Sequence, residues 1–169
     1  MSRHLAIPVC AFVALASGFA ATEAHAANTC DAAYEAGIKS IQTPHHVYST
    51  TTPRGGQSRT GEALFDGKNE YLLIHGGWRR SAMPQQVMVE AAQEKLKTHP
   101  DACTLVGDRV ANGQAVSVYK VNNKETGTEQ TVRILKSSGL MQGATATRDG
   151  ATIETRYEYT NVTAPAGAN

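Results

Sequence analysis

The run YLLIHGGWRRS at residues 71–81 comes nearest to catalytic chemistry in this chain. A His-Gly-Gly run occurs in the oxyanion-hole segment of esterases, where backbone N–H groups stabilise a developing negative charge. Those enzymes also need a serine in a Gly-x-Ser-x-Gly turn between a strand and a helix. The nearest approach is Ser137, which has Gly139 two positions after it but Leu135 two positions before it. The sequence therefore predicts no catalytic residues and no enzyme.

The histidines do not indicate a metal site. His45, His46, His75 and His99 include no pair four residues apart, the spacing that places two ligands on one helix face. His45 and His46 are adjacent, and neighbours in a strand point to opposite faces. The stretch GEALFDGKN (61–69) resembles a phosphate loop, but it is one residue too long and lacks the magnesium-binding Ser or Thr. We expect no metal, no cofactor and a simple turn at residues 66–69.

The segment 71–81 has a second interpretation. Gly76 and Gly77 permit a tight hairpin or a bulge, and either would bring Trp78 to a face of a sheet beside Arg79 and Arg80. Because catalytic partners are lacking, we interpret the segment as strand structure that carries Trp78.

Residues 1–26 have the pattern of a secretory signal peptide. A basic start with Arg3 is followed by an apolar run from Leu5 to Ala21 and by Ala24-His25-Ala26, with small residues at the two positions that signal peptidase inspects. The run is shorter and more broken than the roughly 20 residues of a membrane span. We therefore expect cleavage after Ala26, export to the periplasm, and no transmembrane segment.

The mature chain is small and nearly neutral. Removing residues 1–26 leaves 169 − 26 = 143 residues and takes away one basic and one acidic side chain, so the net charge stays at +1. No run of Lys or Arg suggests nucleic acid as a partner. The length fits one domain, which we place at residues 27–162, followed by a flexible polar tail at 163–169.

Two cysteines remain after cleavage, Cys30 and Cys103. In an oxidising compartment pairing is the usual outcome, and the closed loop would stabilise the fold by about 4 kcal/mol. The alternative is a nucleophilic thiol, which would need a partner base at a recognisable spacing. We see no such base, and we predict a Cys30–Cys103 disulfide.

Two helices are predicted. The first begins near Thr29 and ends before Pro44. The second begins at Pro84 and ends before Pro100, so the disulfide would join the start of the first helix to the exit of the second. The apolar positions of the second helix are Met88, Ala92 and Leu96 on one stripe, with Val87 and Ala91 beside it.

The rest of the chain predicts β-strands joined by turns. HHVYSTTT (45–52) is rich in β-branched residues, and hairpins are indicated by turns at 66–69, at Asn112-Gly113, near Gly127 and at Asp149-Gly150. If residues 112 and 113 form a two-residue loop, the expected pairs are Val110–Ala115, Asp108–Ser117 and Val106–Tyr119.

The last hairpin can be checked for consistency. Its expected pairs are Ala146–Ile153, Ala144–Thr155, Gln142–Tyr157 and Leu140–Tyr159, all on one face. Met141 falls on the opposite, more polar face. Small residues in the middle and aromatic residues toward the end suit a sheet that curves. The predicted fold class is thus α+β, mainly β: a curved antiparallel sheet whose dry face is covered by two helices.

The order of several segments resembles the LolA-like superfamily of periplasmic lipoprotein carriers and their relatives, including LolB- and RseB-type proteins. The segments are the strand with GGWRR before a helix, CTLVGDRVANGQAVSVYKV (103–121), TVRILKSSGLMQG (131–143) and the closing YEYTNVTAP (157–165). This resemblance covers nearly all of the mature chain. It implies an incomplete β-barrel whose concave face is covered by helices and can hold acyl chains.

The predicted function is a non-catalytic binding protein that holds a hydrophobic or acylated ligand, lipid or lipoprotein, between sheet and helices. The alternative is a module that binds another envelope protein and has a filled core. The aromatic residues either line the concave surface or only fill the core, and both interpretations stay open. The predicted ligand contacts are Tyr71, Trp78, Met88, Tyr119, Leu140, Tyr157 and Tyr159.

Overall fold

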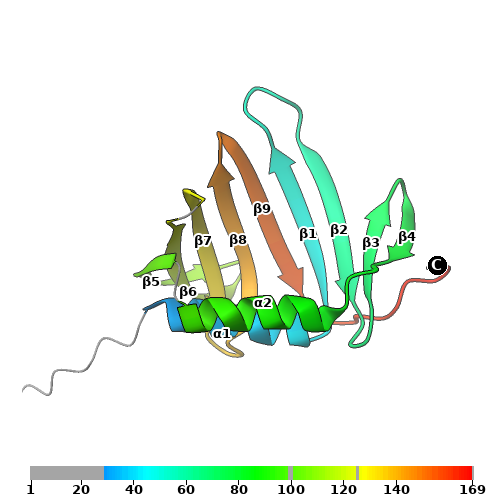
Figure 1. Ribbon diagram of the computed structural model, residues 1–169, viewed down its shortest axis with the longest axis horizontal. Coiled ribbons are helices and arrows are strands. Elements are labelled where there is room, and N and C mark those ends of the chain that lie inside the picture. Colours follow the sequence, from blue (N-terminus) through cyan, green and yellow to red (C-terminus); the bar gives the residue numbers. More distant parts are fainter. Residues whose placement is uncertain (1–28, 99–100, 125, 169) are drawn as a thin grey trace, which may run out of the picture.

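The computed structural model describes residues 29–98, 101–124 and 126–168. Its elements are one nine-stranded antiparallel sheet and two helices (Figure 1). In chain order they are α1 (Thr29–Gln42), β1 (His45–Thr52), β2 (Arg59–Phe65), β3 (Glu70–Ile74), β4 (Gly77–Arg80), α2 (Gln85–Thr98), β5 (Asp101–Ala111), β6 (Gln114–Asn123), β7 (Thr128–Leu135), β8 (Met141–Arg148) and β9 (Ala151–Glu158). The predicted α+β class, mainly β, is confirmed. The predicted signal peptide and the residues 99–100 at the exit of α2 lie outside the described part.

The sheet is a meander with one long-range junction. Its strand order is β4-β3-β2-β1-β9-β8-β7-β6-β5, so the first strand pairs with the last, and β4 and β5 form the two edges. Within the described residues the sheet curves without closing into a barrel, and both helices cross its concave side (Figure 1). We call the face turned to the helices the inner face and the opposite one the outer face. The predicted incomplete barrel with helices over its concave face is confirmed.

Helix α1 is fixed at both ends. Cys30, fully buried, is bonded to Cys103 in β5, and this confirms the predicted disulfide. Near the other end the Ser40 hydroxyl, only 1% exposed, accepts a hydrogen bond from the Met141 backbone N–H at 2.9 Å and lies 3.0 Å from the Tyr159 hydroxyl oxygen. The helix is thereby attached to β5, to the start of β8 and to the residue after β9.

Helix α2 packs along α1. Val89 is its buried residue, and Met88, Ala92 and Leu96 are half-buried, which agrees with the predicted stripe. Val87 and Ala91, which the sequence placed beside this stripe, are exposed. The packed side of α2 includes Val89. Because a helix has 3.6 residues per turn, Val89, two residues after Val87, lies on nearly the opposite side of the helix from Val87.

The hairpin of β5 and β6 has its predicted loop but not all of its predicted register. Val110 pairs with Ala115 and Asp108 with Ser117, as expected. Tyr119, however, pairs with Leu105 and not with Val106, because a β-bulge shifts the register between Leu105 and Gly107. Gly107 has φ 129° there, a conformation that suits glycine.

A second irregularity alters the start of β8. Ala146–Ile153 and Ala144–Thr155 pair as predicted, and the β8–β9 ladder begins at Gly143–Arg156. On its other side β8 shifts register against β7, so that Met141 pairs with Ile134. Met141 packs with the inner core, and its expected place on the polar face is wrong. Alternation of side chains holds only while the strand is regular.

Buried side chains gather in two clusters. The inner one joins Ala36 of α1 to Val121, Val132 and Ile134 of the sheet. The other consists of Val116, Val118 and Leu135, which Leu140 and Tyr159 also contact. In the described part, neither helix has the length and apolar character that crossing a membrane requires.

Candidate functional site

A cavity of about 330 Å³ lies between the two helices and the inner face of the sheet. Its apolar wall is made by small or flexible side chains from all three sides: Ala33 and Gly37 of α1, Ala92 of α2, and Val121, Val132 and Met141 of the sheet. Ligand pockets in proteins usually measure about 300 to 1,000 Å³ and have a mainly apolar lining. This is the space between sheet and helices that the sequence predicted.

The remaining lining of this cavity is polar, and much of it lies toward one end of the strands, where Asn123 pairs with Thr128 and β8 ends at Arg148. It includes two cationic side chains, Lys95 of α2 and Arg148 of β8, together with Asp101 at the start of β5. The uncharged polar lining residues are Tyr34, Asn123, Thr126, Thr128 and Gln130. The cavity is therefore amphipathic: apolar on one part of its surface, hydrogen-bonding and cationic on another.

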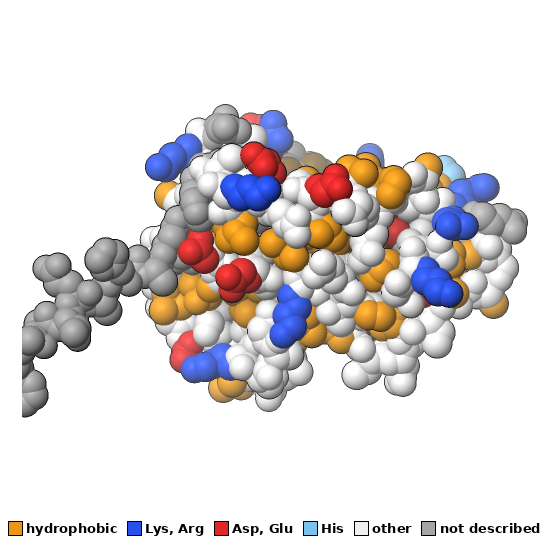
Figure 2. All heavy atoms as spheres, turned by 60° about the horizontal axis from the view of Figure 1, so that its bottom comes forward, with side chains coloured by type: hydrophobic (Ala, Val, Ile, Leu, Met, Phe, Trp, Pro, Cys, Tyr) orange, Lys and Arg blue, Asp and Glu red, His pale blue; other side chains and the backbone are white. Residues whose placement is uncertain are grey.

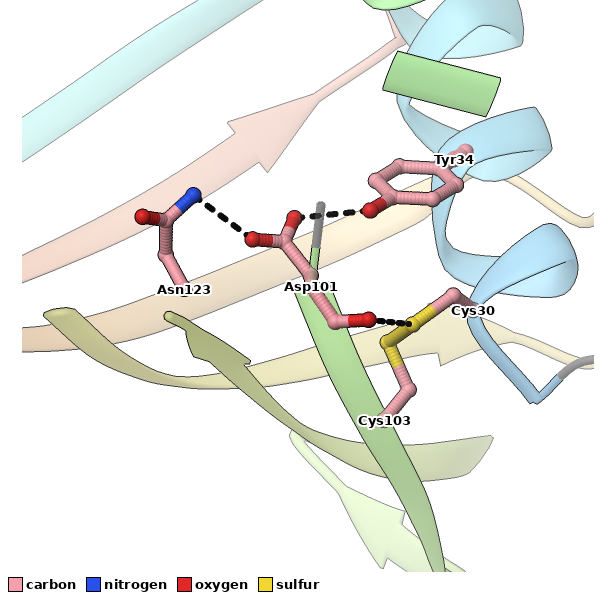
Figure 3. The surroundings of a disulfide bond; sticks show 5 residues. All are labelled: Cys30, Tyr34, Asp101, Cys103 and Asn123. Carbon is pink, nitrogen blue, oxygen red and sulfur yellow. Dashed lines mark hydrogen bonds between the residues drawn. A yellow bond between two sulfur atoms is a disulfide. The ribbon is translucent and has the colours of Figure 1, made fainter. Parts of the chain in front are cut away.

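A hydrogen-bond network joins three of the polar lining residues, Tyr34, Asp101 and Asn123, beside the disulfide (Figure 3). Tyr34 donates to Asp101 Oδ2 at 2.8 Å, and Asn123 Nδ2 donates to Asp101 Oδ1 at 2.7 Å. The disulfide sulfur of Cys30 lies 3.4 Å from the carbonyl oxygen of Asp101. Burial, reinforced by the hydrogen bond to Asp101, raises the pKa of Tyr34 to about 12. Tyr34 therefore stays neutral and holds the Asp101 carboxylate in place.

An aromatic cluster occupies the inner face farther along the sheet. The ring of His45 lies 5.9 Å from Phe65, 5.6 Å from Tyr157 and 6.2 Å from Tyr159, measured between ring centroids. Burial lowers the pKa of His45, although its ring nitrogen Nδ1 lies 2.7 Å from the Thr43 carbonyl oxygen. Tyr159 also donates to the Met141 carbonyl oxygen at 2.7 Å. Because these groups already contact one another, the cluster packs the sheet against the end of α1.

The adjacent residue, His46, turns to the outer face, as predicted for neighbours in a strand. Its Nε2 lies 3.1 Å from Glu62 Oε2, and its Nδ1 lies 2.9 Å from the Tyr48 hydroxyl. The ring of Trp78 meets His46 edge-on at 5.7 Å. The guanidinium of Arg156 lies 4.3 Å above the Tyr48 ring. Trp78 is thus on a β-strand, as predicted, but on the face away from the helices.

The His-Gly-Gly segment forms a hairpin turn. Leu73 pairs with Trp78 and Ile74 with Gly77, so His75 and Gly76 are the two loop residues. Both have positive φ, 52° and 79°, as a type I′ turn requires. His75 is exposed at this turn, whereas Ser137 lies after β7, with β2, β1, β9 and β8 between β3 and β7 in the sheet. The two residues that suggested esterase chemistry are not neighbours in the sheet.

Two further expectations concern turns and metals. The side chain of Asp66 accepts the backbone N–H groups of Lys68 and Asn69 at 2.8 Å each, which confirms a simple turn in place of a phosphate loop. These bonds lower the pKa of Asp66. Among residues 29–98, 101–124 and 126–168, no group of three or more His, Cys, Asp or Glu side chains could hold a metal ion.

The seven predicted ligand contacts lie in different places. Tyr119 packs on the inner core and lines a groove of about 410 Å³ beside α1, whereas Leu140, Tyr157 and Tyr159 line another of about 430 Å³. Met88 is half-buried on α2, and Tyr71 is buried with its hydroxyl 3.2 Å from Asp66 Oδ2. None of the seven lines the 330 Å³ cavity, and as ligand contacts they stay a prediction.

The residues that border the cavity carried little signal in the sequence. Ala33 and Gly37 are small residues one turn apart, and their use as a cavity wall depends on what α1 packs against. Lys95 and Arg148 are ordinary surface residues by type. Tyr34 stood at the expected helical spacing from Cys30, but only the fold brings it to Asp101, 67 positions along the chain.

A larger hollow of about 480 Å³ lies on the outer face of β5 to β8. Its lining includes Thr104, Lys120, Glu129, Thr131 and Thr145, whose side chains are polar. Such a wall would leave an apolar ligand against hydrogen-bonding groups that lose their water. The inner cavity, by contrast, has Ala33, Val121, Val132 and Met141 in its lining.

Known structures share this fold. The lipoprotein LppX of Mycobacterium tuberculosis matches with a TM-score of 0.51 and 11% identity, over 81% of this chain and 97% of LppX. MucB of Pseudomonas aeruginosa, in its complex with MucA, matches with a TM-score of 0.52 and 15% identity over 82% of this chain. This chain spans only 59% of that MucB chain.

At the level of sequence there are no such matches: no protein-family model and no curated protein matches this chain. At 11% and 15% identity, the structural likenesses establish the fold alone. The chain shares the fold of LppX and MucB, a curved antiparallel sheet with helices, which is the architecture that its sequence motifs predicted.

Proposed function

We propose that this protein is a non-catalytic binding protein of the periplasm that holds the acyl chain of a lipid or lipoprotein. The observation that carries the proposal is the inner cavity of about 330 Å³ between α1, α2 and strands β6 to β8. The site lies between the helices and the sheet face that they cover (Figure 1), next to the buried cluster of Ala36, Val121, Val132 and Ile134.

The cavity wall suits an alkyl chain for physical reasons. Val121 and Val132 present branched aliphatic side chains, and Met141 is a flexible side chain that adapts to the shape of its neighbour. Ala33 and Gly37 leave space where larger residues would fill it. Burying each methylene of a ligand there would contribute about 0.8 kcal/mol, so even a chain of moderate length would bind.

The periplasm suits both the sequence and the disulfide. The signal-like residues 1–26 would be removed, leaving a single domain of residues 27–162 with the short tail 163–169. The bond between Cys30 and Cys103 forms and persists in oxidising compartments. LppX, which shares the fold, is a lipoprotein.

A second function has one observation in its favour. MucB, which also shares the fold, forms a complex with MucA. By this alternative the protein would bind another envelope protein, and the inner cavity would be incidental to that interaction. The first function needs the inner cavity and the second does not, so the two can be separated by experiment.

Native mass spectrometry of the full chain, purified from the periplasm of a producing bacterium, tests the first function. We expect a population with one co-purified acyl compound, and we expect the delipidated protein to take up dodecanol added to it. A protein that is isolated bare and takes up no added acyl compound would contradict the proposal. An envelope protein captured by chemical crosslinking to that bare protein would favour the alternative.

A further inference from the structure

We propose that the ligand is a single-chain anionic amphiphile, whose negatively charged head is held by Lys95 and Arg148. This inference rests on the proposed function and adds the chemical class of the ligand. Its basis is the division of one cavity into an apolar wall and a cationic border.

The two cationic side chains reach the cavity from opposite walls. Lys95 is on α2, three residues after Ala92, so both face the same side of that helix. Arg148 is the last residue of β8, at the other end of the strand from Met141, which lines the apolar wall. An alkyl chain lying against Met141 and Val132 would therefore have its head near positive charge on both walls.

The cationic groups are available for a ligand. Lys95 forms no ion pair with any other described residue. Arg148 lies 3.4 Å from Asp149, but both side chains are largely exposed, at 62% and 89%, and exposed pairs of this kind contribute little. A ligand carboxylate or phosphate at the cavity border can accept two parallel hydrogen bonds from the Arg148 guanidinium, which a neutral head group cannot match.

The one carboxylate among the described lining residues does not cancel this charge. Asp101 accepts hydrogen bonds from Tyr34 on one oxygen and from Asn123 on the other (Figure 3). Both of its carboxylate oxygens are thus held by neutral donors on the wall beside the disulfide. Two cations and one stabilised anion leave the border of the cavity net positive.

Neutral polar groups complete the border. Thr126, Thr128 and Gln130 line the same cavity, and hydroxyl and amide groups can donate to an anionic head. Viewed from the helix side, hydrophobic side chains lie across the middle of the molecule with Lys, Arg, Asp and Glu among and around them (Figure 2). The polar and charged residues of the cavity lining suit an amphiphile better than a ligand that is apolar throughout.

The test compares lauric acid with dodecanol, which have the same chain length and differ in the head. At about pH 8, where a carboxyl group is ionised, each compound is titrated into the delipidated full chain, and displacement of a neutral fluorescent probe is followed. We expect laurate to bind about tenfold more tightly than dodecanol, with the preference falling as salt is added.

Charge reversals locate the effect. We expect Lys95→Glu and Arg148→Glu each to weaken laurate binding by about tenfold while leaving dodecanol binding nearly unchanged. Lys97→Glu and Arg109→Glu are the matched controls, because these exposed cations do not line the cavity and change the net charge by the same amount. The controls should leave both affinities as they are.

Each outcome decides between the two claims. Equal binding of laurate and dodecanol would overturn the inference and leave the proposed function standing. An equal loss in Lys97→Glu and Lys95→Glu would overturn it too, since net charge alone would then explain the preference. Binding of neither compound would overturn the proposed function itself.

Discussion

The hydroxyl of Tyr34 donates a 2.8 Å hydrogen bond to Asp101 and so joins α1 to the first residue of β5. The disulfide between Cys30 and Cys103 joins the same two elements within one helical turn of that bond. Together they fix the helix that provides Ala33 and Gly37 to the cavity. The geometry of the proposed binding site therefore depends on this corner of the molecule.

Replacing Tyr34 with phenylalanine should destabilise the protein. The change removes a hydrogen bond to a charged group and leaves one Asp101 oxygen without that donor, which should lower the free energy of unfolding by about 1 to 3 kcal/mol. Tyr48→Phe is the control, because its hydroxyl bonds to His46 on the outer face. Urea unfolding near neutral pH measures both. An equal loss of unfolding free energy in the two variants would mean that the Tyr34–Asp101 hydrogen bond stabilises the protein no more than the Tyr48–His46 hydrogen bond does.

The same variant should change the response to alkaline pH. The pKa of Tyr34 is raised to about 12 in the folded protein, above its ordinary value of 10.0. The contribution of the Tyr34 hydroxyl to the free energy of unfolding is therefore fully present below pH 10. It is lost as the pH rises toward about 12. Tyr34→Phe should flatten this part of the stability profile. An unchanged slope in the variant would contradict the assignment.

Removing the disulfide should cost more than any single hydrogen bond. The bond links residues 73 positions apart, and a loop of this length restricts the unfolded chain enough to contribute about 4 kcal/mol. We expect the double variant Cys30→Ala/Cys103→Ala to show this loss in urea unfolding. A reduced wild-type sample should behave like the double variant. A loss of well under 1 kcal/mol in both would show that α1 is held by packing alone.

His45 should make the protein sensitive to acid. Burial lowers its pKa below the ordinary 6.5, so the folded state binds its proton less readily than the unfolded chain does. The contribution of neutral His45 to the free energy of unfolding should then be fully present above pH 6.5. It should be lost as the pH decreases through the folded-state pKa of His45. His45→Gln should weaken this dependence, and His75→Gln, at an exposed turn, is the control. If His45→Gln kept the full acid dependence of stability, or if His75→Gln weakened it, the acid-sensitive group would be a residue other than His45.

Much of the fold followed from local signals in the sequence. The turns at Asn112-Gly113 and Asp149-Gly150 have positive φ at both residues, which Asn, Asp and Gly tolerate best, and such turns fix hairpin pairing nearby. Prolines marked the borders of both helices. Two cysteines in a chain with a signal-like start gave the disulfide. Each of these features depends on a few neighbouring residues.

The errors arose where the backbone departs from regular alternation. The bulge at Val106 and the register shift beside Met141 each change strand pairing by one residue. The alternation of apolar and polar residues in the sequence does not show where such a change occurs. Gly107 was the available clue to the first. Trp78 was expected in a strand, and it is there. The face that it occupies, beside His46 of β1, depends on how β2 and β3 pair between β1 and β4. The cavity residues come from six helices and strands and could not be grouped without the fold.

Gly37 offers the most direct test of the cavity, because a side chain placed there would enter it. A Cβ added at Gly37 would meet no atom within 4 Å, and the residue lies in the middle of α1. Gly37→Ala should stabilise the helix by about 0.5 to 1 kcal/mol and leave most of the space free. Gly37→Phe should fill the space and still fold, since the ring replaces an apolar ligand against Val132 and Met141.

The decisive measurement is the affinity of these two variants for dodecanol, followed by displacement of the neutral probe, with their unfolding free energies measured alongside. We expect Gly37→Ala to bind like the wild type and Gly37→Phe to lose binding by at least about tenfold while remaining folded. Undiminished dodecanol binding by a folded Gly37→Phe protein would mean that the chain is held somewhere else, and the inner cavity would not be the binding site.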